Sequence, residues 1–444
     1  IATGSERALD AARRAADLLY RHFVVDQRPL RLASAHVGMA ATSVLEPIAV
    51  LFRLTGEQRY LDLCNYVVTS WEDPDNPYTW KYQDGCQLLT SLISHGNVHK
   101  TANRKAYEML SNLVGLMELY RIDPNERYLV ACKNAWQDIV ANRLYVTGTA
   151  SYFEQFTPDH RLPPGEAVGE GCVTVTWLQL NIHLLELTGE MQYADELEKT
   201  TYNALLGAQS PLTGQICYFT PLVGSKAYGD HDKGEPKISC CTSSVPRGIT
   251  MIPAFVSGLL FGKPAVLQYV PGRHALDGGI TLHIHGDYPK SGAMEIEVEP
   301  GEQSRFTLVL RVPEWADNFE ASVDGMTFRP NENRVVEIDR YWSLGDRVFV
   351  NIPLELRLID DGDETSGSAA FALGPHVLAT DSAIDAAAGI PRSDWWGDIV
   401  HTVSLTLNGE PTELRLVSFA DAGQQKEKYA VLHEGLEASQ VIKS

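Results

Sequence analysis

Up to about residue 210, apolar residues recur at the three- and four-residue spacing of helices that bury one face. A repeated phrase links these segments. A helix ends at a turn such as Leu-Thr-Gly-Glu or Ile-Asp-Pro-Asn, and a tyrosine then begins the next helix. Glycine at such a turn suits a helix C-cap, and proline stops the chain similarly. The clearest of the predicted helices are 8–23, 37–55, 58–71, 104–120, 126–145, 173–187, 193–206 and 243–260.

Helix pairs that repeat roughly every 60–70 residues predict a solenoid or closed ring of helical hairpins. We therefore expect a helical toroid of the (α/α)6-barrel type. The pattern supplies about nine or ten helices rather than twelve, so we expect the remaining helices upstream of Ile1. Rings of this kind are common among enzymes that act on carbohydrates, which is an analogy and not evidence of activity.

From about residue 265 the pattern changes to strict alternation between turns rich in Pro, Gly and Asp. Short alternating strands at this spacing predict a β-sandwich. The predicted strands are 279–285, 293–298, 305–312, 320–323, 335–338 and 348–352, with two more at 403–407 and 413–417. The fold class is thus α+β and multidomain. The expected domains are a helical catalytic domain over 1–262, a β-sandwich over 263–380 and a mixed β segment over 381–444.

Net charge and hydropathy limit the classes of partner that the chain is expected to bind. The net charge of −20, from 57 acidic and 37 basic residues, disfavours a polyanion, so we expect no nucleic acid partner. The longest apolar runs, 48–52 and 255–261, are far shorter than the roughly 20 residues of a membrane span, so we expect no membrane partner. A signal peptide is not visible, which favours a cytoplasmic location. A homodimer is compatible with the sequence.

Seven cysteines, an odd and sparse set, do not form the pattern of a disulfide framework. Cys64 and Cys132 fall in helical patterns and are expected to be buried thiols. Two motifs stand apart: Glu170-Gly171-Cys172 and Ser239-Cys240-Cys241-Thr242, each beside a predicted helix N-terminus that would stabilise thiolates. Three thiolates and one carboxylate are the four ligands of a tetrahedral Zn²⁺ site, and three buried thiols without metal are the alternative.

Through these two motifs the chain resembles the β-L-arabinofuranosidase family, glycoside hydrolase family 127 and its relatives. The likeness runs over nearly the whole chain. It is carried by the two cysteine motifs and by residues 105–113, 143–148, 311–358 and 416–423. The pairing of Glu-x-Cys with Cys-Cys about 70 residues later is its most specific part.

The resemblance implies the roles of the site residues. Glu170, Cys172, Cys240 and Cys241 match Zn²⁺ ligands, and Cys240 also matches the nucleophile of a retaining hydrolase. Glu154, in Tyr-Phe-Glu-Gln-Phe, matches the acid/base glutamate. For the sugar, an oligosaccharide or glycoside, Tyr218 matches a pocket tyrosine, and His36 is a further candidate for binding it. Retention requires a nucleophile and a proton donor on opposite sides of the anomeric carbon, which this set supplies.

Plainer interpretations stay open. Glu154 is alternatively an ordinary loop carboxylate, Glu170 a helix-capping neighbour, and Tyr218 a half-buried aromatic residue. The chain also departs from the family pattern. It lacks the Gly-His that precedes the helix at 103–105, and Thr-Ser-Ser follows the cysteine pair where Pro and Asn are usual. These departures bear on the identity of the sugar more than on the mechanism.

Two other functions compete. A polysaccharide lyase or unsaturated-uronide hydrolase on a helical ring would tolerate a chelator and the loss of Cys240. A non-catalytic sugar-binding scaffold with structural zinc would bind without turnover, because ligand type alone does not separate structural from catalytic sites.

Overall fold

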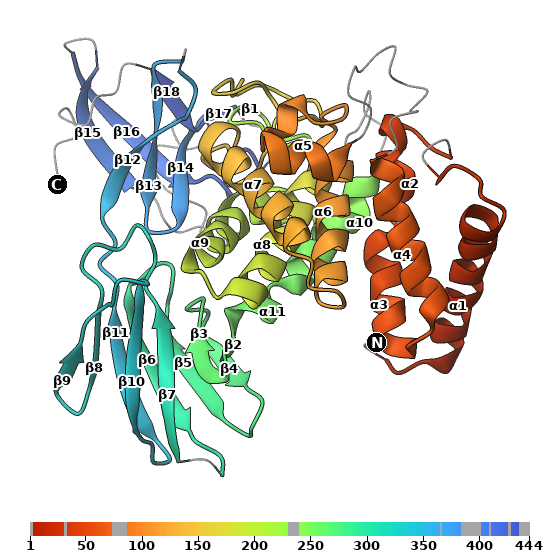
Figure 1. The fold of residues 1–444 in the computed structure, drawn as a ribbon. Coiled ribbons are helices and arrows are strands. Elements are labelled where there is room, and N and C mark those ends of the chain that lie inside the picture. Colours follow the sequence, from red (N-terminus) through yellow and green to blue (C-terminus); the bar gives the residue numbers. More distant parts are fainter. Residues whose placement is uncertain are drawn as a thin grey trace. The chain divides into compact units, whose positions relative to one another are not determined.

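A computed structural model describes residues 3–30, 33–72, 87–229, 239–302, 304–364, 366–382, 401–407, 410–424 and 428–434 (Figure 1). The chain forms two compact units. The first comprises residues 1–144 and 150–161, and the second comprises residues 145–149 and 162–444. The predicted boundaries after 262 and 380 stay predictions.

The first unit is helical, and its helices follow the predicted segments closely. They are α1 (Glu6–Leu19), η1 (Tyr20–Val25), η3 (His36–Gly38), α2 (Met39–Thr42), α3 (Leu45–Thr55), α4 (Gln58–Trp71), α5 (Leu88–Ser94), η4 (Val98–Lys100), α6 (Ala106–Tyr120) and α7 (Glu126–Asn142). Helix α3 packs on α4 and α6, and α7 packs on α5 and α6. A Cβ at Gly115 of α6 would lie 2.7 Å from Cβ of Leu45, so glycine permits the close α3–α6 contact. Helix α5 was not predicted.

One stretch of this unit, His36–Thr55, is long and apolar enough to cross a membrane by length and composition. The buried core helix of a globular protein passes the same test. Left-handed backbone at Val37 and Gly38 interrupts the stretch, and buried Leu45, Ile48 and Leu51 pack inside the unit. The feature is therefore weak evidence for a membrane span.

The second unit begins with helices and continues into sheets. Its helices are α8 (Gly171–Thr188), α9 (Met191–Thr200), η5 (Thr201–Leu205), α10 (Cys240–Met251) and α11 (Pro253–Val256). Helix α8 is buried almost all round, and it packs on α9 and α10. The predicted helix 243–260 is wrong at its end, because Ser257–Leu260 form strand β2. Phe261 and Gly262, both at positive φ, turn the chain back into β3 (Lys263–Val266).

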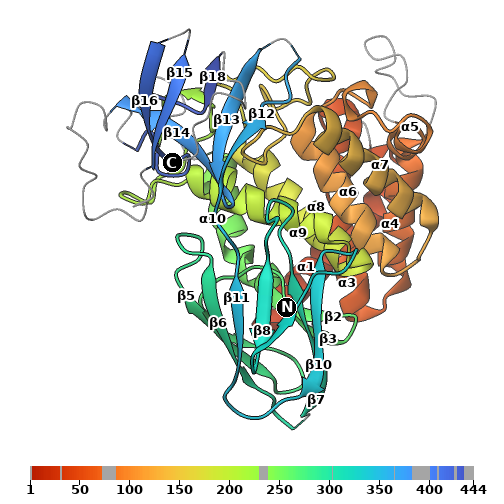
Figure 2. The same cartoon turned by 90° about the vertical axis from the view of Figure 1, so that its left-hand side faces the viewer.

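Two sheets face one another in the predicted sandwich. The first has the order β10 (Val335–Tyr341), β7 (Arg305–Arg311), β3 and β2, with β3 and β7 parallel. The second has the order β4 (Gly272–Ala275), β5 (Thr281–Gly286), β6 (Ala293–Glu299), β11 (Asp346–Asn351), β8 (Glu320–Val323) and β9 (Met326–Phe328). Figure 2 shows β5, β6, β11 and β8 side by side. Alternate residues of both sheets, such as Leu282, Ile296, Leu308 and Val336, fill the shared core.

A third, eight-stranded sheet follows in the same unit. Its strands are β1 (Val223–Gly224), β12 (Leu356–Asp360), β13 (Ser368–Leu373), β14 (His376–Asp381), β15 (His401–Leu407), β16 (Glu410–Ser418), β17 (Tyr429–Ala430) and β18 (Leu432–Glu434). Buried Lys226, two residues after β1, holds the segment that follows β16, because its ammonium donates to the carbonyl oxygens of Phe419 at 2.6 Å and Ala420 at 3.1 Å. The predicted order, helices followed by β-rich domains, is confirmed.

Candidate metal centre

Four predicted ligand residues meet in the second unit. One ligand atom from each of Glu170, Cys172, Cys240 and Cys241 lies within 4.8 Å of the others. Sγ of Cys172 is 3.7 Å from Sγ of Cys241, which is 3.9 Å from Sγ of Cys240. Sγ of Cys240 lies 3.8 Å from Oε1 of Glu170. These sulfur separations are too long for a disulfide bond, which is about 2.05 Å.

The cluster forms because two helices begin at the same place. Glu170 is the N-cap of α8, and Cys240 and Cys241 are the first two residues of α10, whose N-cap Ser239 forms a capping box with Thr242. Both N-termini direct the positive ends of their dipoles at the thiols, which favours thiolates.

Glycines set the approach of the two helices. A Cβ at Gly171 would lie 2.7 Å from Cγ2 of Val245 and 3.3 Å from Cβ of Cys241. A Cβ at Gly248 would lie 2.6 Å from Cγ2 of Val175. Neither position has room for a side chain. Glycine at both positions therefore allows α8 and α10 to approach closely enough to assemble the cluster.

Tyr218 joins the cluster from an adjacent extended segment. The N–H of Gly171 donates to the carbonyl of Tyr218 at 3.0 Å, and the N–H of Thr220 donates to the carbonyl of Val168 at 2.7 Å. This pairing places the Tyr218 hydroxyl 3.4 Å from Oε1 of Glu170 and 3.8 Å from Sγ of Cys240. The predicted pocket tyrosine thus lies beside both a carboxylate and a thiol of the cluster.

The four ligand residues differ in their exposure to solvent. Glu170, Cys172 and Cys241 are at most 3% exposed, whereas Cys240 is exposed. The pKa of Cys240 is lowered by hydrogen bonding with Cys172, then with Cys241 and Tyr218. The pKa of Cys241 is raised by its thiol neighbours and by burial. Among the four residues, the accessible thiol is therefore also the one whose surroundings favour a thiolate.

The donor set fits a tetrahedral metal ion. Zn–S bonds of about 2.3 Å at tetrahedral angles place two sulfur ligands about 3.8 Å apart. The Cys172–Cys241 and Cys240–Cys241 separations of 3.7 and 3.9 Å agree with that value. Three sulfurs and one carboxylate oxygen are ligands that suit Zn²⁺, and the arrangement identifies a site for a metal ion without identifying the metal.

Glu154 and His36 belong to the first unit, so the structure does not bring them together with the cysteines within one compact body. Glu154 lies in a tight turn, where Tyr152 and Gln155 exchange backbone hydrogen bonds of 3.0 and 3.1 Å. Both central residues, Phe153 at φ 45° and Glu154 at φ 64°, adopt the left-handed conformation that type I′ turns require and that favours Gly or Asn. Such strained residues cluster at functional sites.

The first unit gathers other titratable groups around Glu154. The Lys105 ammonium forms an ion pair with its carboxylate. Nε2 of His36 lies 3.6 Å from Oε1 of Glu108 in the first turn of α6, and Nδ1 of His36 lies 3.2 Å from the Asn103 side-chain nitrogen. Burial raises the pKa of Glu108, and the nearby charges of Lys105 and His36 oppose that shift.

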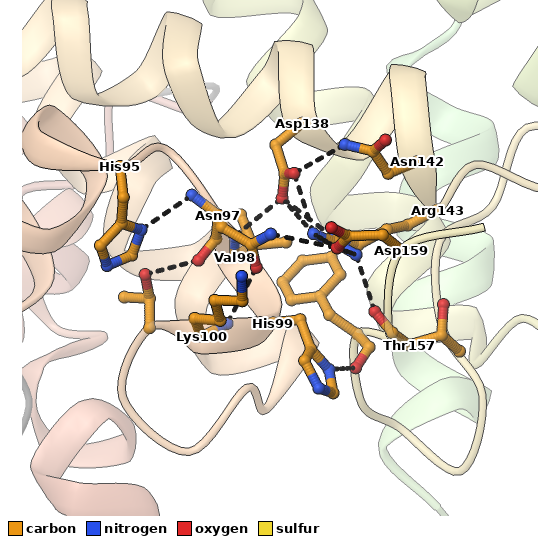
Figure 3. Close-up of polar contacts among 12 residues, drawn as sticks. His95, Asn97, Val98, His99, Lys100, Asp138, Asn142, Arg143, Thr157 and Asp159 are labelled. Atoms are coloured by element: carbon orange, nitrogen blue, oxygen red, sulfur yellow. Dashed lines mark hydrogen bonds and ion pairs between the residues drawn. The ribbon is translucent and has the colours of Figure 1, made fainter. Parts of the chain in front are cut away.

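A buried arginine holds the end of the segment that carries Glu154 (Figure 3). The Arg143 guanidinium, which is 1% exposed, donates to Asp138 at 2.8 and 3.0 Å, to the carbonyl of Thr157 at 2.8 Å and to Asp159 at 2.8 and 2.9 Å. His99 binds the carbonyl of Phe156 through Nδ1 at 2.8 Å. Residues 156–159 are thereby fixed to the end of α7.

Sequence reasoning missed Lys105 and Glu108, which interact with the predicted acid/base, and Arg143, which holds residues 157 and 159 of the same segment. The resemblance carried residues 105–113 and 143–148 without assigning them roles. The predicted burial of Cys64 and Cys132 is confirmed, since each is fully buried, and Cys217 is fully buried as well.

Comparison with known structures defines the class of fold. A solved glycoside hydrolase matches with TM-score 0.76 at 20% identity, covering 97% of this chain and 80% of its own. A GH127 β-L-arabinofuranosidase from Geobacillus stearothermophilus T6 matches with TM-score 0.70 at 18% identity, covering 89% and 71%. A further GH127 β-arabinofuranosidase gives 0.65 at 19%, covering 91% and 77%. The predicted helical toroid followed by a β-sandwich is the fold of these proteins.

Two family models match the sequence directly: the GH127 β-L-arabinofuranosidase catalytic domain over residues 1–254, and the GH127 middle domain over residues 265–354. The chain therefore belongs to the GH127 β-L-arabinofuranosidase family. The non-reducing end β-L-arabinofuranosidase of Bifidobacterium longum subsp. longum is 24% identical over 354 residues, which is 73% of this chain. The chain spans about half, 53%, of the length of that relative.

Proposed function

We propose that this chain is a retaining glycoside hydrolase that acts on a β-L-arabinofuranoside or a related furanoside. Cys240 is the nucleophile, Glu154 is the acid/base, and Glu170, Cys172, Cys240 and Cys241 hold Zn²⁺. The observation that carries the proposal is the cluster itself: four ligand atoms within 4.8 Å, of which only the Cys240 thiol is exposed. The cluster lies within residues 1–254, which match the GH127 catalytic domain, and this supports a role for it in a glycosidase active site.

A bound Zn²⁺ would keep the thiols deprotonated at neutral pH, which is the form in which sulfur is a nucleophile. In the first step Sγ of Cys240 forms a bond to the anomeric carbon, while the bond to the leaving oxygen breaks and that oxygen takes a proton from Glu154. In the second step the Glu154 carboxylate takes a proton from water. The resulting hydroxide bonds to the anomeric carbon, and the C–S bond breaks to restore the thiolate. Two inversions at one carbon give net retention.

Tyr218 has a supporting position in this proposal. Its hydroxyl lies within 3.8 Å of the nucleophilic sulfur and donates to the Glu170 carboxylate. A phenol so placed stabilises the thiolate when the C–S bond breaks, and it presents an aromatic edge to a bound sugar. His36 is proposed to contribute polar contacts to the substrate from the first unit.

The scaffold alternative, with a purely structural metal, fits the exposure pattern less well. Four protein ligands are usual for a structural zinc site, so the ligand count does not decide between the two, whereas a catalytic site must let substrate reach a reactive group. Cys240 is accessible and the other three ligands are buried. The burial pattern therefore favours a reactive site.

A panel of 4-nitrophenyl furanosides and pyranosides tests the proposal, with released nitrophenol and the anomeric form of the first product as readouts. We expect turnover of the β-L-arabinofuranoside with retention, and loss of turnover in Cys240→Ser and Glu154→Gln. Cys217→Ser, which removes another buried thiol of the same unit, serves as the control. Wild-type turnover in Cys240→Ser, or release of an ultraviolet-absorbing unsaturated product, would contradict the proposal.

A further inference from the structure

Glu154 is attached to one segment of the first unit by both backbone and side chain. The N–H of Ala106 donates to the carbonyl of Glu154 at 3.0 Å, and the N–H of Phe156 donates to the carbonyl of Arg104 at 3.0 Å. Nε of Arg104 donates to Oε1 of Gln155 at 2.9 Å. The ammonium of Lys105, in the middle of this pairing, reaches the Glu154 carboxylate.

Lys105 is itself held in place. It is the N-cap residue of α6, and its side chain is 13% exposed, against 31% for Glu154. Glu108, in the first turn of the same helix, interacts electrostatically with Lys105, His36 and Glu154. Because the Lys105 side chain is already partly buried, it has few rotamers to lose when it pairs with Glu154. The entropy cost of this ion pair is therefore smaller than for an exposed lysine.

We propose that Lys105 is a positioning residue for Glu154: its ammonium fixes the carboxyl group on the strained turn and favours the ionised form. The inference rests on the proposed role of Glu154 as the acid/base. The ion pair with Lys105 restricts the orientation of the Glu154 carboxylate on the turn. Glu108 shares the charge of Lys105, so the cation does not prevent Glu154 from taking up a proton during turnover.

The charged groups around Glu154 determine in which direction its protonation should shift when Lys105 is replaced. Lys105 contacts Glu154 directly, and Arg104 lies on the paired segment. Glu108 interacts with the charges of both Lys105 and Glu154, and His36 contacts Glu108. Removing the Lys105 cation takes away its attraction for the Glu154 carboxylate and leaves the repulsion between Glu154 and Glu108, which favours the protonated form of Glu154. The alkaline limb of the kcat/KM profile, where the acid loses its proton, then moves to higher pH.

The test compares the wild type, Lys105→Met, Lys105→Arg and the control Lys100→Met, an exposed lysine of the same unit. The substrate is 4-nitrophenyl β-L-arabinofuranoside. We expect Lys105→Met to lower kcat about 10- to 100-fold through misplacement of the acid. KM should change less than roughly threefold, and Lys105→Arg should restore part of kcat. The control should match the wild type.

A second measurement does not need turnover. Protein labelled with ¹³C at the glutamate carboxyl carbons is titrated by NMR, and the Glu154 signal is assigned by its loss in Glu154→Gln. We expect this signal to titrate at higher pH in Lys105→Met than in the wild type. An unchanged titration, or wild-type kcat and pH limb in folded Lys105→Met, overturns the inference. An inactive wild type would instead contradict the proposed function, while the NMR comparison still decides the effect of Lys105.

Discussion

Sγ of Cys172 and Sγ of Cys241 lie 3.7 Å apart although 69 positions separate them in the chain. Neither thiol is exposed, and Ser244 Oγ lies 3.3 Å from the Cys172 sulfur. Two buried thiols at this distance bury little apolar surface and form no disulfide bond. Their separation suits two ligands of one metal ion, whose binding would stabilise the folded state.

Removing one buried ligand is expected to empty the metal site. Cys172→Ser and Cys241→Ser should each lower the zinc content, measured by plasma mass spectrometry after dialysis, from about one ion per chain to a small fraction of that value. Cys217→Ser, a change at an equally buried thiol outside the cluster, should leave the content unchanged. Full zinc content in Cys172→Ser would show that this thiol is not a ligand.

Gly171→Ala should damage the same site without touching a ligand. The added Cβ would meet Val245 at 2.7 Å and Cys241 at 3.3 Å, so the N-termini of α8 and α10 must separate. Overpacking of this kind costs about 1–3 kcal/mol and should also lower zinc content. Gly258→Ala, where nothing lies within 4 Å of the added atom, is the matched control. Equal thermal midpoints and zinc contents for the two variants would refute this reading.

Much of this site could be predicted from sequence. The ligands sit in two short motifs at helix starts, and a helix N-terminus is marked locally by its capping residues and by the onset of apolar periodicity. Lys105 could not be found in this way. Its contact with Glu154 depends on pairing between residues 104–106 and 154–156 and on a left-handed turn at Phe153, where the sequence offers no glycine.

In the fold, too, elements with strong local signals were predicted, whereas one that depends on tertiary pairing was not. Helix α4 (Gln58–Trp71) and strand β8 (Glu320–Val323) match their predicted bounds, because strong periodicity and clear turns define them. Strand β2 was predicted as helix, because Ser257–Leu260 is a short apolar run whose period is ambiguous. Its pairing with β3 across the turn at Phe261 and Gly262 decides the conformation, and that signal is tertiary.

Arg143→Met should destabilise the first unit strongly. The buried guanidinium neutralises Asp138 and holds the carbonyl of Thr157, so its loss leaves a partly buried carboxylate without its cation. Breaking a buried pair in this way costs about 3–5 kcal/mol. Arg14→Met, which removes an exposed pair with Asp10, should cost less than about 1 kcal/mol. Chemical denaturation monitored by circular dichroism measures both, and similar losses in the two variants would contradict the assignment.

Stability should fall in mild acid because of a buried histidine on β14. Burial, and secondarily the nearby His401, lowers the pKa of His376 from 6.5 to about 4. Between these values the unfolded chain binds a proton that the folded chain does not, so the unfolding free energy falls as pH drops from 6.5 to 4. The full loss is about 3 kcal/mol and is absent above pH 6.5.

Urea denaturation at pH 7 and pH 4.5 measures this effect. His376→Gln should lose less stability between the two pH values than the wild type does. His285→Gln, at an exposed histidine, should behave as the wild type. An identical pH dependence in His376→Gln and the wild type would show that another group carries the acid sensitivity.

The most direct test of the account is the intact mass of the protein after rapid mixing with an activated β-L-arabinofuranoside. With the Glu154→Gln variant, which lacks the base for the second step, we expect a mass increase of one pentosyl group. Peptide mapping should place that group on Cys240, and Cys240→Ser should show no adduct. Rapid turnover by the wild type with no adduct on Cys240 under any quench condition, or an adduct on another residue, would contradict the account.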